Sequence, residues 1–251
     1  MAEVLPGNDG PSASPKPIGN LLSDFLRKHA DGNFKSPLHP LIERGEVGKE
    51  VRKLQREVGQ RYAECAFDNY HVLEETTTER RLSQREVFTL VREFANDVME
   101  RSKNGGGLVL FGAVGTGKDH LMIASAFVAV VKFLIKVKWL NASTLAEQTR
   151  DLFKEERLQN DLIATYSRVP ILAISDLTPQ KGETSPFLTE VILRIIDIRY
   201  REFRPTWATM NARDGEEARQ VLADPIIDRM RHHSLCLPCQ WSSARKPAEL
   251  E

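Results

Sequence analysis

The sequence has few cysteines and no excess of charge of either sign. Its three cysteines are Cys65, Cys236 and Cys239, an odd and sparse set that argues against a disulfide framework and is typical of a reducing compartment. The 35 basic and 35 acidic residues cancel, which excludes a protein that coats nucleic acid by overall charge but leaves room for a local basic face. We therefore expect a cytoplasmic protein.

Long apolar runs are also missing. A membrane-spanning helix needs roughly 20 apolar residues, whereas the most apolar segment extends only from Leu121 to Val131 before Lys132 and Lys136 interrupt it. The N-terminus lacks the basic start and apolar stretch of a secretory signal. The sequence predicts no membrane partner, and the segment at 121–131 is better explained as a buried helix.

The first 62 residues differ in composition from the rest. Residues 1–20 are rich in proline, glycine and serine, which predicts a disordered tail. Residues 21–62 form a predicted helical extension, with one short amphipathic helix at 21–29 and a charged helix at about 41–62. This extension is too thin for a core of its own, so it either lies on the main domain or contacts a partner, and a solvated helix is an equal alternative.

Residues 63–251 alternate between strand-like and helix-like patterns and form the predicted main domain. The apolar runs at 108–111 and 171–174 are typical of strands buried on both faces. The alternation predicts an α/β fold with a parallel sheet of about five strands and helices on both faces. The expected strands are 108–111, 136–140, 171–174, 206–209 and 235–237, and the expected helices are one from Ser83, one after a glycine loop, 143–157, 184–203, 214–222 and 225–232.

The glycine loop joins a predicted strand to a predicted helix. It reads Gly112-Ala113-Val114-Gly115-Thr116-Gly117-Lys118, followed by Asp119 and His120. Glycines let the backbone wrap round a phosphate with its N–H groups inward, and the next helix adds its positive dipole end. Lys118 can reach the outer phosphates of ATP. A plain turn with Asp119 at a helix start is the alternative, but the flanking strand and helix favour a nucleotide-binding P-loop.

Acidic and hydroxyl residues near the loop predict a Mg²⁺ site. A P-loop usually ends in Ser or Thr, whose hydroxyl ligates Mg²⁺, but here Asp119 occupies that position. The predicted strand at 171–174 is followed by Ser175 and Asp176, a suitable place for a group that holds the metal and the attacking water. We therefore assign Asp119, Ser175 and Asp176 to the metal.

Several stretches in a fixed order, from Tyr62 to Arg245, resemble the DnaC/IstB-like branch of the AAA+ ATPases. They are RYAECAFDNY, LVLFGAVGTGKDHL, ILAISDL, IIDIRY, PTWATMNA, DPIIDRM and SSAR. The resemblance implies an AAA+ P-loop fold, ATP and Mg²⁺, and an ATPase that acts as a DNA helicase loader in replication. The alternatives are a transposition-type accessory ATPase and a nucleotide-gated binding module with little hydrolysis. The implied partners are a replicative helicase or a transposase, further copies of the chain, and single-stranded DNA as a candidate.

The resemblance also implies roles for individual residues. Asp176 would position metal or water, Asn211 would be the polar sensor that holds the attacking water, and Arg229 would be an arginine finger for a neighbouring subunit. Arg245 would be the second sensor arginine. The alternatives are that Asn211 caps the helix that begins near Asp214, that Arg229 is a surface ion-pair partner, and that Arg245 is frayed near the C-terminus.

Two positions depart from the family pattern, which has two adjacent acids after the strand and Thr or Ser after the loop lysine. This chain has Ser175 in place of the first acid and Asp119 in place of the hydroxyl residue. Because both positions lie on the same side of the Mg²⁺ in P-loop enzymes, we hypothesise that the two changes compensate. The competing explanation is degeneration, in which the extra carboxylate repels the triphosphate.

Three further features have weaker functional interpretations. Cys236 and Cys239 have zinc-like spacing, but a structural zinc site needs four ligands and the nearest other candidates are His232, His233 and the distant Cys65. Four arginines with Tyr200 among them suggest a phosphate-contacting face, but pairing with Asp197 and Glu202 on a solvated helix is slightly favoured. These arginines are Arg194, Arg199, Arg201 and Arg204. His120 is better explained by packing than by catalysis.

Overall fold

The computed structural model describes residues 44–73, 82–152, 155–178 and 185–245. The predicted tail at 1–20 and the predicted helix at 21–29 lie outside the described residues. The charged helix expected at 41–62 is described from residue 44 onward.

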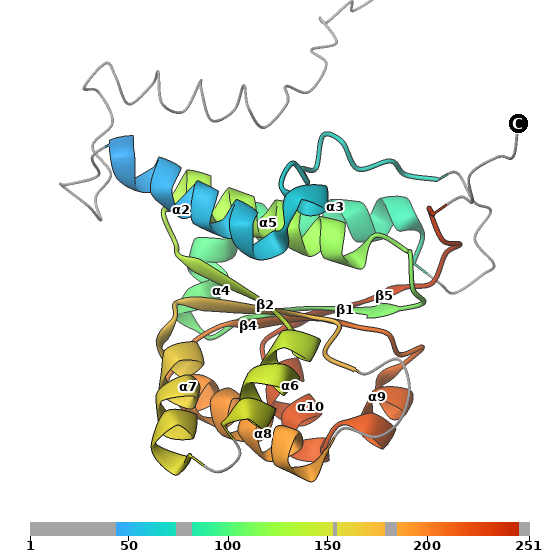
Figure 1. Ribbon diagram of the computed structural model, residues 1–251. Helices are drawn as coiled ribbons and strands as arrows, with labels where there is room; N and C mark the ends of the chain where they lie inside the picture. The colour runs from blue at the N-terminus through green and yellow to red at the C-terminus, as the bar shows by residue number, and fades with distance from the viewer. Residues whose placement is uncertain (1–43, 74–81, 153–154, 179–184, 246–251) are drawn as a thin grey trace, which may run out of the picture.

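A five-stranded parallel sheet forms the centre of the molecule, in the order β2-β3-β4-β1-β5 (Figure 1). Neighbouring strands are in register at Val109 with Ala208 and at Leu110 with Leu237. Pro238 is tolerated because β5 is an edge strand. The predicted α/β class and parallel sheet are confirmed. The strands are β1 (Leu108–Gly112), β2 (Val137–Asn141), β3 (Ile171–Ser175), β4 (Thr206–Met210) and β5 (Leu235–Cys239).

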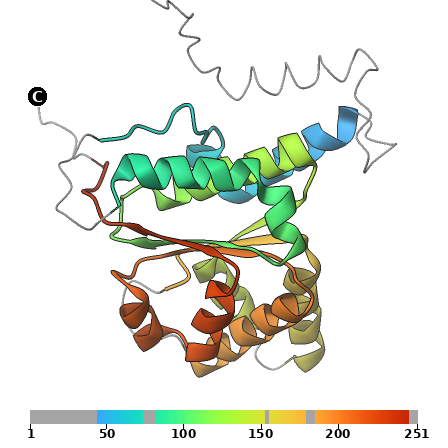
Figure 2. The same ribbon diagram turned by 180° about the vertical axis from the view of Figure 1, so that it is seen from behind.

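Helices cover both faces of the sheet, as both views show (Figures 1 and 2). The upper layer in Figure 1 contains α2 (Arg44–Val58), the short 3₁₀ helix η1 (Gln60–Tyr62), α3 (Gln84–Asn96), α4 (Val98–Lys103) and α5 (Lys118–Phe133). The lower layer contains α6 (Ala142–Asp151), α7 (Glu156–Arg168), α8 (Pro186–Arg201), α9 (Gly215–Val221) and α10 (Asp224–Arg231). Within the described ranges, no helix has both the length and the apolar character needed to cross a membrane.

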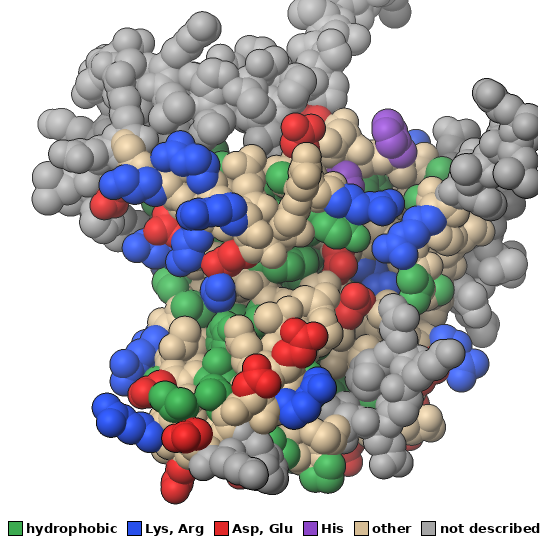
Figure 3. Space-filling view, in the orientation of Figure 1, with side chains coloured by type: hydrophobic (Ala, Val, Ile, Leu, Met, Phe, Trp, Pro, Cys, Tyr) green, Lys and Arg blue, Asp and Glu red, His purple; other side chains and the backbone are tan. Residues whose placement is uncertain are grey.

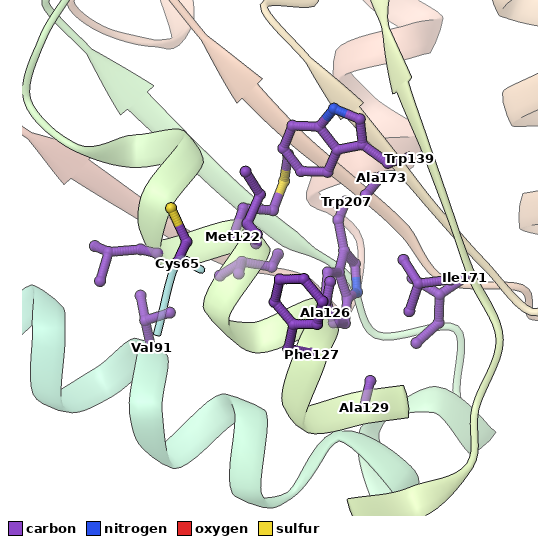
Figure 4. Packing of buried hydrophobic residues seen from close by; sticks show 14 of the residues in the cluster. Cys65, Val91, Met122, Ala126, Phe127, Ala129, Trp139, Ile171, Ala173 and Trp207 are labelled. Atoms are coloured by element: carbon purple, nitrogen blue, oxygen red, sulfur yellow. The ribbon is translucent and has the colours of Figure 1, made fainter. Parts of the chain in front are cut away.

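The sheet separates two hydrophobic cores. Along β1, Leu108 and Leu110 belong to the upper core and Val109 belongs to the lower one, because successive side chains of a strand point to opposite faces. In the upper core, Phe127 of α5 packs beside Trp207 of β4 (Figure 4). The segment expected to be a buried helix, 121–131, lies in α5 and supplies much of this core.

Helix α2 lies on the main domain and not away from it. Its apolar residues Val47, Val51, Leu54 and Val58 are all buried in the upper core, and α2 packs against α5 and β2. Glu57 fixes the contact, because its carboxylate accepts hydrogen bonds from Lys138 Nζ at 2.8 Å and from the Trp139 N–H at 2.9 Å. The described part of the predicted extension therefore shares the core of the main domain.

The prediction of a single helix at 143–157 is wrong in its extent. The chain forms α6, which ends at Asp151, and a second helix α7 that begins at Glu156. Helix α7 buries only Ile163, Tyr166 and Ser167, so its apolar pattern is too weak to reveal it. The helix expected from Ser83 is present as α3, and Ser83 caps it through a reciprocal pair of contacts with Glu86.

The structure separates the arginines on and after α8 into one that is buried and others that are partly or fully exposed. Arg199 is not on a solvated or phosphate-contacting face, because it lies on the buried face of α8 and is 0% exposed. Arg201 and Arg204 pair with Asp197 and Glu202, as the solvated-face interpretation predicts.

The cysteines of β5 give no metal site. Cys239 lies in the upper core and Cys236 packs against the lower core, so their side chains are on opposite faces of the sheet. The zinc interpretation fails for this geometric reason.

Candidate nucleotide-binding site

The glycine loop lies at the carboxyl ends of the strands, between β1 and α5, and other segments hold it from outside. The Thr116 carbonyl accepts hydrogen bonds from Trp241 Nε1 at 2.8 Å and from the Tyr70 hydroxyl at 3.3 Å. The Gly115 carbonyl accepts one from the Ala244 N–H at 2.9 Å. No described residue accepts a hydrogen bond from the N–H groups of Gly115 and Gly117. With the carbonyls held outward, these N–H groups are available to an anion.

Glycine is required in the loop for both backbone conformation and space. Gly115 has φ 86° and Gly117 has φ 83°, values that side-chain-bearing residues rarely adopt. A Cβ at Gly115 would come within 2.0 Å of Ser243 Oγ, and one at Gly117 within 2.8 Å of the Tyr70 ring. The loop is therefore enclosed by Tyr70 on one side and by residues 241–244 on the other.

Lys118 begins α5 and is folded back onto the loop. Its Nζ donates to the Gly112 carbonyl at 2.9 Å and to the Ala113 carbonyl at 2.6 Å, and the side chain is buried. Burial lowers the pKa of the Lys118 ammonium. Phosphate oxygens are stronger acceptors than neutral carbonyls, so this ammonium group is placed to exchange its partners when a triphosphate binds.

Asp119 joins three elements through its carboxylate. Its Oδ2 accepts a hydrogen bond from Ser175 Oγ at the end of β3 at 3.0 Å, and its Oδ1 accepts one from Thr209 Oγ1 of β4 at 2.7 Å. Burial raises the pKa of the Asp119 carboxyl, and the hydrogen bond from Thr209 acts in the opposite direction without cancelling the rise. The two residues that depart from the family pattern, Asp119 and Ser175, are thus direct partners.

Asp176 and Asn211 form a second pair at the same edge. Asn211 Nδ2 donates to Asp176 Oδ1 at 2.8 Å. The Asp176 N–H donates to Thr209 Oγ1 at 3.0 Å, and Asp176 has φ 52°, a left-handed conformation that costs about 1 kcal/mol or more outside glycine. The alternative that Asn211 caps α9 is wrong, because Asp214 accepts from the first N–H groups of that helix itself.

The donor set fits a magnesium ion held mainly by a nucleotide. Asp119, Ser175 and Asp176 all lie at the carboxyl edge, and the described residues contain no cluster of three or more His, Cys, Asp or Glu that could hold a metal unaided. Mg²⁺ at triphosphate sites keeps several waters and takes one or two protein oxygens besides the phosphates. One carboxylate with a hydroxyl beside it meets that requirement.

His120 and two residues that sequence reasoning missed, Tyr70 and Trp241, lie around the loop, and a third missed residue, Thr209, holds Asp119 and Asp176. His120 Nε2 contacts the Ala66 carbonyl at 2.7 Å and its ring lies edge-on to Tyr70, which confirms the packing interpretation. Tyr70 and Trp241 were missed because their partner in the loop is distant in sequence. Thr209 was also missed, although a threonine inside a buried strand that leads to Asn211 was a usable signal.

Of the two predicted arginines, Arg245 lies near the loop and Arg229 does not. Arg229 of α10 forms an ion pair with Asp197 at 3.1 Å and lines a cavity of about 250 Å³ near the amino ends of the strands, so it does not meet Lys118 within one chain. Its ion-pair interpretation is confirmed, and its role as a finger for another subunit stays a prediction. Arg245 is exposed at the end of the segment that contacts Gly115, and its charge adds to burial in lowering the pKa of the Lys118 ammonium. Its role as a second sensor stays a prediction.

Several known proteins are similar to this chain in sequence. The sequence model of the IstB-like ATP binding protein family matches residues 26–251. The replicative helicase loader DnaC of Buchnera aphidicola subsp. Baizongia pistaciae is 30% identical over 213 residues, which cover 78% of this chain and 78% of that protein. The putative ATP-binding protein of insertion sequence IS5376 from Geobacillus stearothermophilus is 26% identical over 222 residues, 85% of this chain and 81% of that protein.

Solved structures agree on the fold. A crystal structure of the DnaC helicase loader matches with a TM-score of 0.60 at 22% identity, over 72% of this chain and 99% of that one. The family match includes the glycine loop, both strand-end pairs and the segment that closes over the loop. The chain therefore belongs to the IstB-like ATP-binding proteins, within the DnaC/IstB-like branch of the AAA+ P-loop fold.

Proposed function

We propose that this protein is an ATP-hydrolysing AAA+ protein that loads a replicative DNA helicase. The observation that carries the proposal is the meeting of the phosphate loop with two strand-end pairs, Asp119 with Ser175 and Asp176 with Asn211. The helicase loader DnaC is 30% identical to this chain over 213 residues, against 26% over 222 residues for the IS5376 protein, and this higher identity favours the loader role.

Binding follows from the groups around the loop. The N–H groups of Gly115 and Gly117 would receive the phosphates, and Lys118 would leave the Gly112 and Ala113 carbonyls for the outer phosphate oxygens. Mg²⁺ held by Asp119 and the phosphates would neutralise charge that builds up on the triphosphate.

Asp176 and Asn211 would have different roles in hydrolysis. The Asp176 carboxylate would orient a water molecule and accept its proton as the water oxygen bonds to the γ-phosphorus and the bond to ADP breaks. Asn211, which already donates to Asp176 Oδ1, would keep that carboxylate aimed at the water. Both side chains therefore contribute to turnover more than to binding.

Assembly would complete the site. Arg229 would reach the nucleotide of a neighbouring subunit and stabilise the charge that develops on the γ-phosphate, after release from Asp197. The cavity beside it is lined by Tyr200, which is 41% exposed, and Phe203, which is 63% exposed. Exposed aromatic side chains of this kind are typical of protein contacts.

The test is ATP turnover by the full chain, alone and with the replicative helicase of the same cell and single-stranded DNA, with Lys118→Ala as the blank. Turnover that rises several-fold only when both are present would support the loader. A rise with a transposase instead would overturn it in favour of the transposition role, which the match to 81% of the insertion-sequence protein makes the second candidate. Turnover no greater than the blank under every condition would leave a nucleotide-gated binding module.

A further inference from the structure

A stripe of basic side chains runs along the outward face of α2. Its members are Lys49, Arg52, Lys53 and Arg56, and all four are exposed. They recur at intervals of three and four residues, so they share one face of the helix, opposite the buried apolar residues. Lys and Arg side chains gather over α2 at the upper left of Figure 3.

The stripe keeps an excess of positive charge because two of the three carboxylates of α2 pair with lysines outside it, which leaves Glu46 of the first turn as the one exposed carboxylate of the helix against four cations. Glu50 pairs with Lys136 at 3.5 Å, and Glu57 pairs with Lys138 at 2.8 Å. None of the four stripe cations pairs with a carboxylate of a described residue. The whole chain has no net charge, so the stripe is a local concentration and does not reflect general basicity.

A shallow hollow of about 520 Å³ lies along the stripe. The residues that line it are Lys49, Arg52, Gln55, Arg56, Gly59 and Gln60. All are basic, amide-bearing or glycine, so the hollow offers charge and hydrogen-bond donors without an apolar anchor. Protein partners bind chiefly through buried aromatic and apolar anchors, and single strands bind by stacking on aromatic rings. A phosphate backbone needs neither.

We propose that the α2 stripe is a binding site for the phosphate backbone of duplex DNA, without sequence preference. Four like charges spaced along roughly 10 Å of helix repel one another, and phosphates would relieve that repulsion while releasing their counterions. The biological use of such a site, to hold the protein on DNA during loading, rests on the proposed function, but the contact itself does not.

The test measures how salt weakens binding to a labelled 30-base-pair duplex of arbitrary sequence, by fluorescence anisotropy with the full chain. The slope of log K against log salt falls by about 0.9 for each phosphate contact that is lost. The variant Lys49→Gln/Arg52→Gln/Lys53→Gln/Arg56→Gln should flatten the slope by about 3.6, and Arg52→Gln alone by about 0.9.

A matched control removes four exposed arginines from the opposite layer, namely Arg150, Arg157, Arg168 and Arg231, by the same change to Gln. It loses the same charge and should keep the wild-type slope. Three results would overturn the proposal. The first is an equal flattening of the slope by the α2 variant and the control, and the second is an unchanged slope in the α2 variant. The third is wild-type protein that binds polyglutamate but not the duplex. ATP binding measured in parallel separates the two hypotheses, because the α2 variant should bind ATP as wild type does.

Discussion

Two clusters of polar contacts lie at opposite ends of the same sheet, and they are built differently. At the amino ends, the Arg199 guanidinium donates to five backbone carbonyls and one hydroxyl. Its acceptors are Tyr166 O, Ser167 O, Val169 O, Pro170 O, Pro205 O and Thr206 Oγ1. At the carboxyl ends, Asp119, Ser175, Asp176 and Asn211 bond mainly to one another's side chains.

The difference separates a structural cluster from a functional one. Backbone carbonyls cannot move without moving their strands and helices, so Arg199 is fixed once the chain has folded. Burial lowers the pKa of Arg199 to about 9, with repulsion from Arg204 as the second cause. That value is above neutral, so the group stays charged with its hydrogen bonds satisfied. Side chains from α5, β3 and β4 can instead change partners when a ligand arrives.

The largest effect should come from removing the fixed cluster. Arg199→Met should lower the free energy of unfolding by at least about 3 kcal/mol, because several buried carbonyls lose their donor at about 1–3 kcal/mol each. Arg199→Lys should recover little, since an ammonium has three donors in a different geometry. Urea denaturation measures this, and a loss below about 1 kcal/mol for Arg199→Met would remove the distinction between the clusters.

Lys118→Ala should give the reverse result. Affinity for ATP should fall about 100-fold or more, equivalent to about 2.7 kcal/mol, because the ammonium that exchanges carbonyls for phosphates is gone. Stability of the nucleotide-free protein should change by less than about 1 kcal/mol, since the substitution removes two hydrogen bonds and also the burial of a charge whose pKa is lowered. Calorimetric ATP titration and urea denaturation on the same samples check both parts.

How far each cluster could be predicted depends on the range of its contacts. The glycine loop and the five strands follow from local patterns. The same patterns located Lys118 in the loop and Ser175 and Asp176 at the end of β3. Thr209 contacts Asp119 across 90 residues, and no local pattern encodes such a pairing. Arg199 was missed for a different reason.

Helix α8 shows what that reason was. Its buried residues Ile192, Ile195, Ile196 and Arg199 continue one helical stripe, so position alone indicated that the arginine faces inward. Grouping it with Arg201 by residue type concealed this. Periodicity is therefore the better guide to burial even for a charged residue.

Exchanging Asp119 and Ser175 should sharpen the comparison, because a cluster made of side chains should tolerate a swap. Asp119→Thr should abolish the gain in ATP affinity that Mg²⁺ provides, about tenfold or 1.4 kcal/mol, and Ser175→Asp should weaken binding without metal by placing two carboxylates together. The double variant Asp119→Thr/Ser175→Asp restores one hydroxyl and one carboxylate and should regain the Mg²⁺ effect. The measurement is binding of a fluorescent ATP analogue with Mg²⁺ or with EDTA. Two results would favour the competing explanation, in which the metal site has degenerated. One is wild-type protein that binds ATP equally with Mg²⁺ and with EDTA. The other is a double variant whose loss of ATP affinity equals the sum of the losses in the single variants.

Tyr70→Phe should have the smallest effect and tests how the loop is held. The substitution keeps the ring that stacks on Phe88 and covers Gly117 but removes the hydroxyl that donates to the Thr116 carbonyl at 3.3 Å. That carbonyl keeps the shorter bond from Trp241 Nε1 at 2.8 Å, so ATP affinity should fall by no more than about fivefold, or 1 kcal/mol. Trp241→Phe removes the buried donor and should cost more in the same titration. If Tyr70→Phe lowers ATP affinity more than Trp241→Phe does, Tyr70 and not Trp241 sets the conformation of the loop. The Thr116 carbonyl would then depend on the longer of its two hydrogen bonds and would be held less firmly than the carbonyls around Arg199.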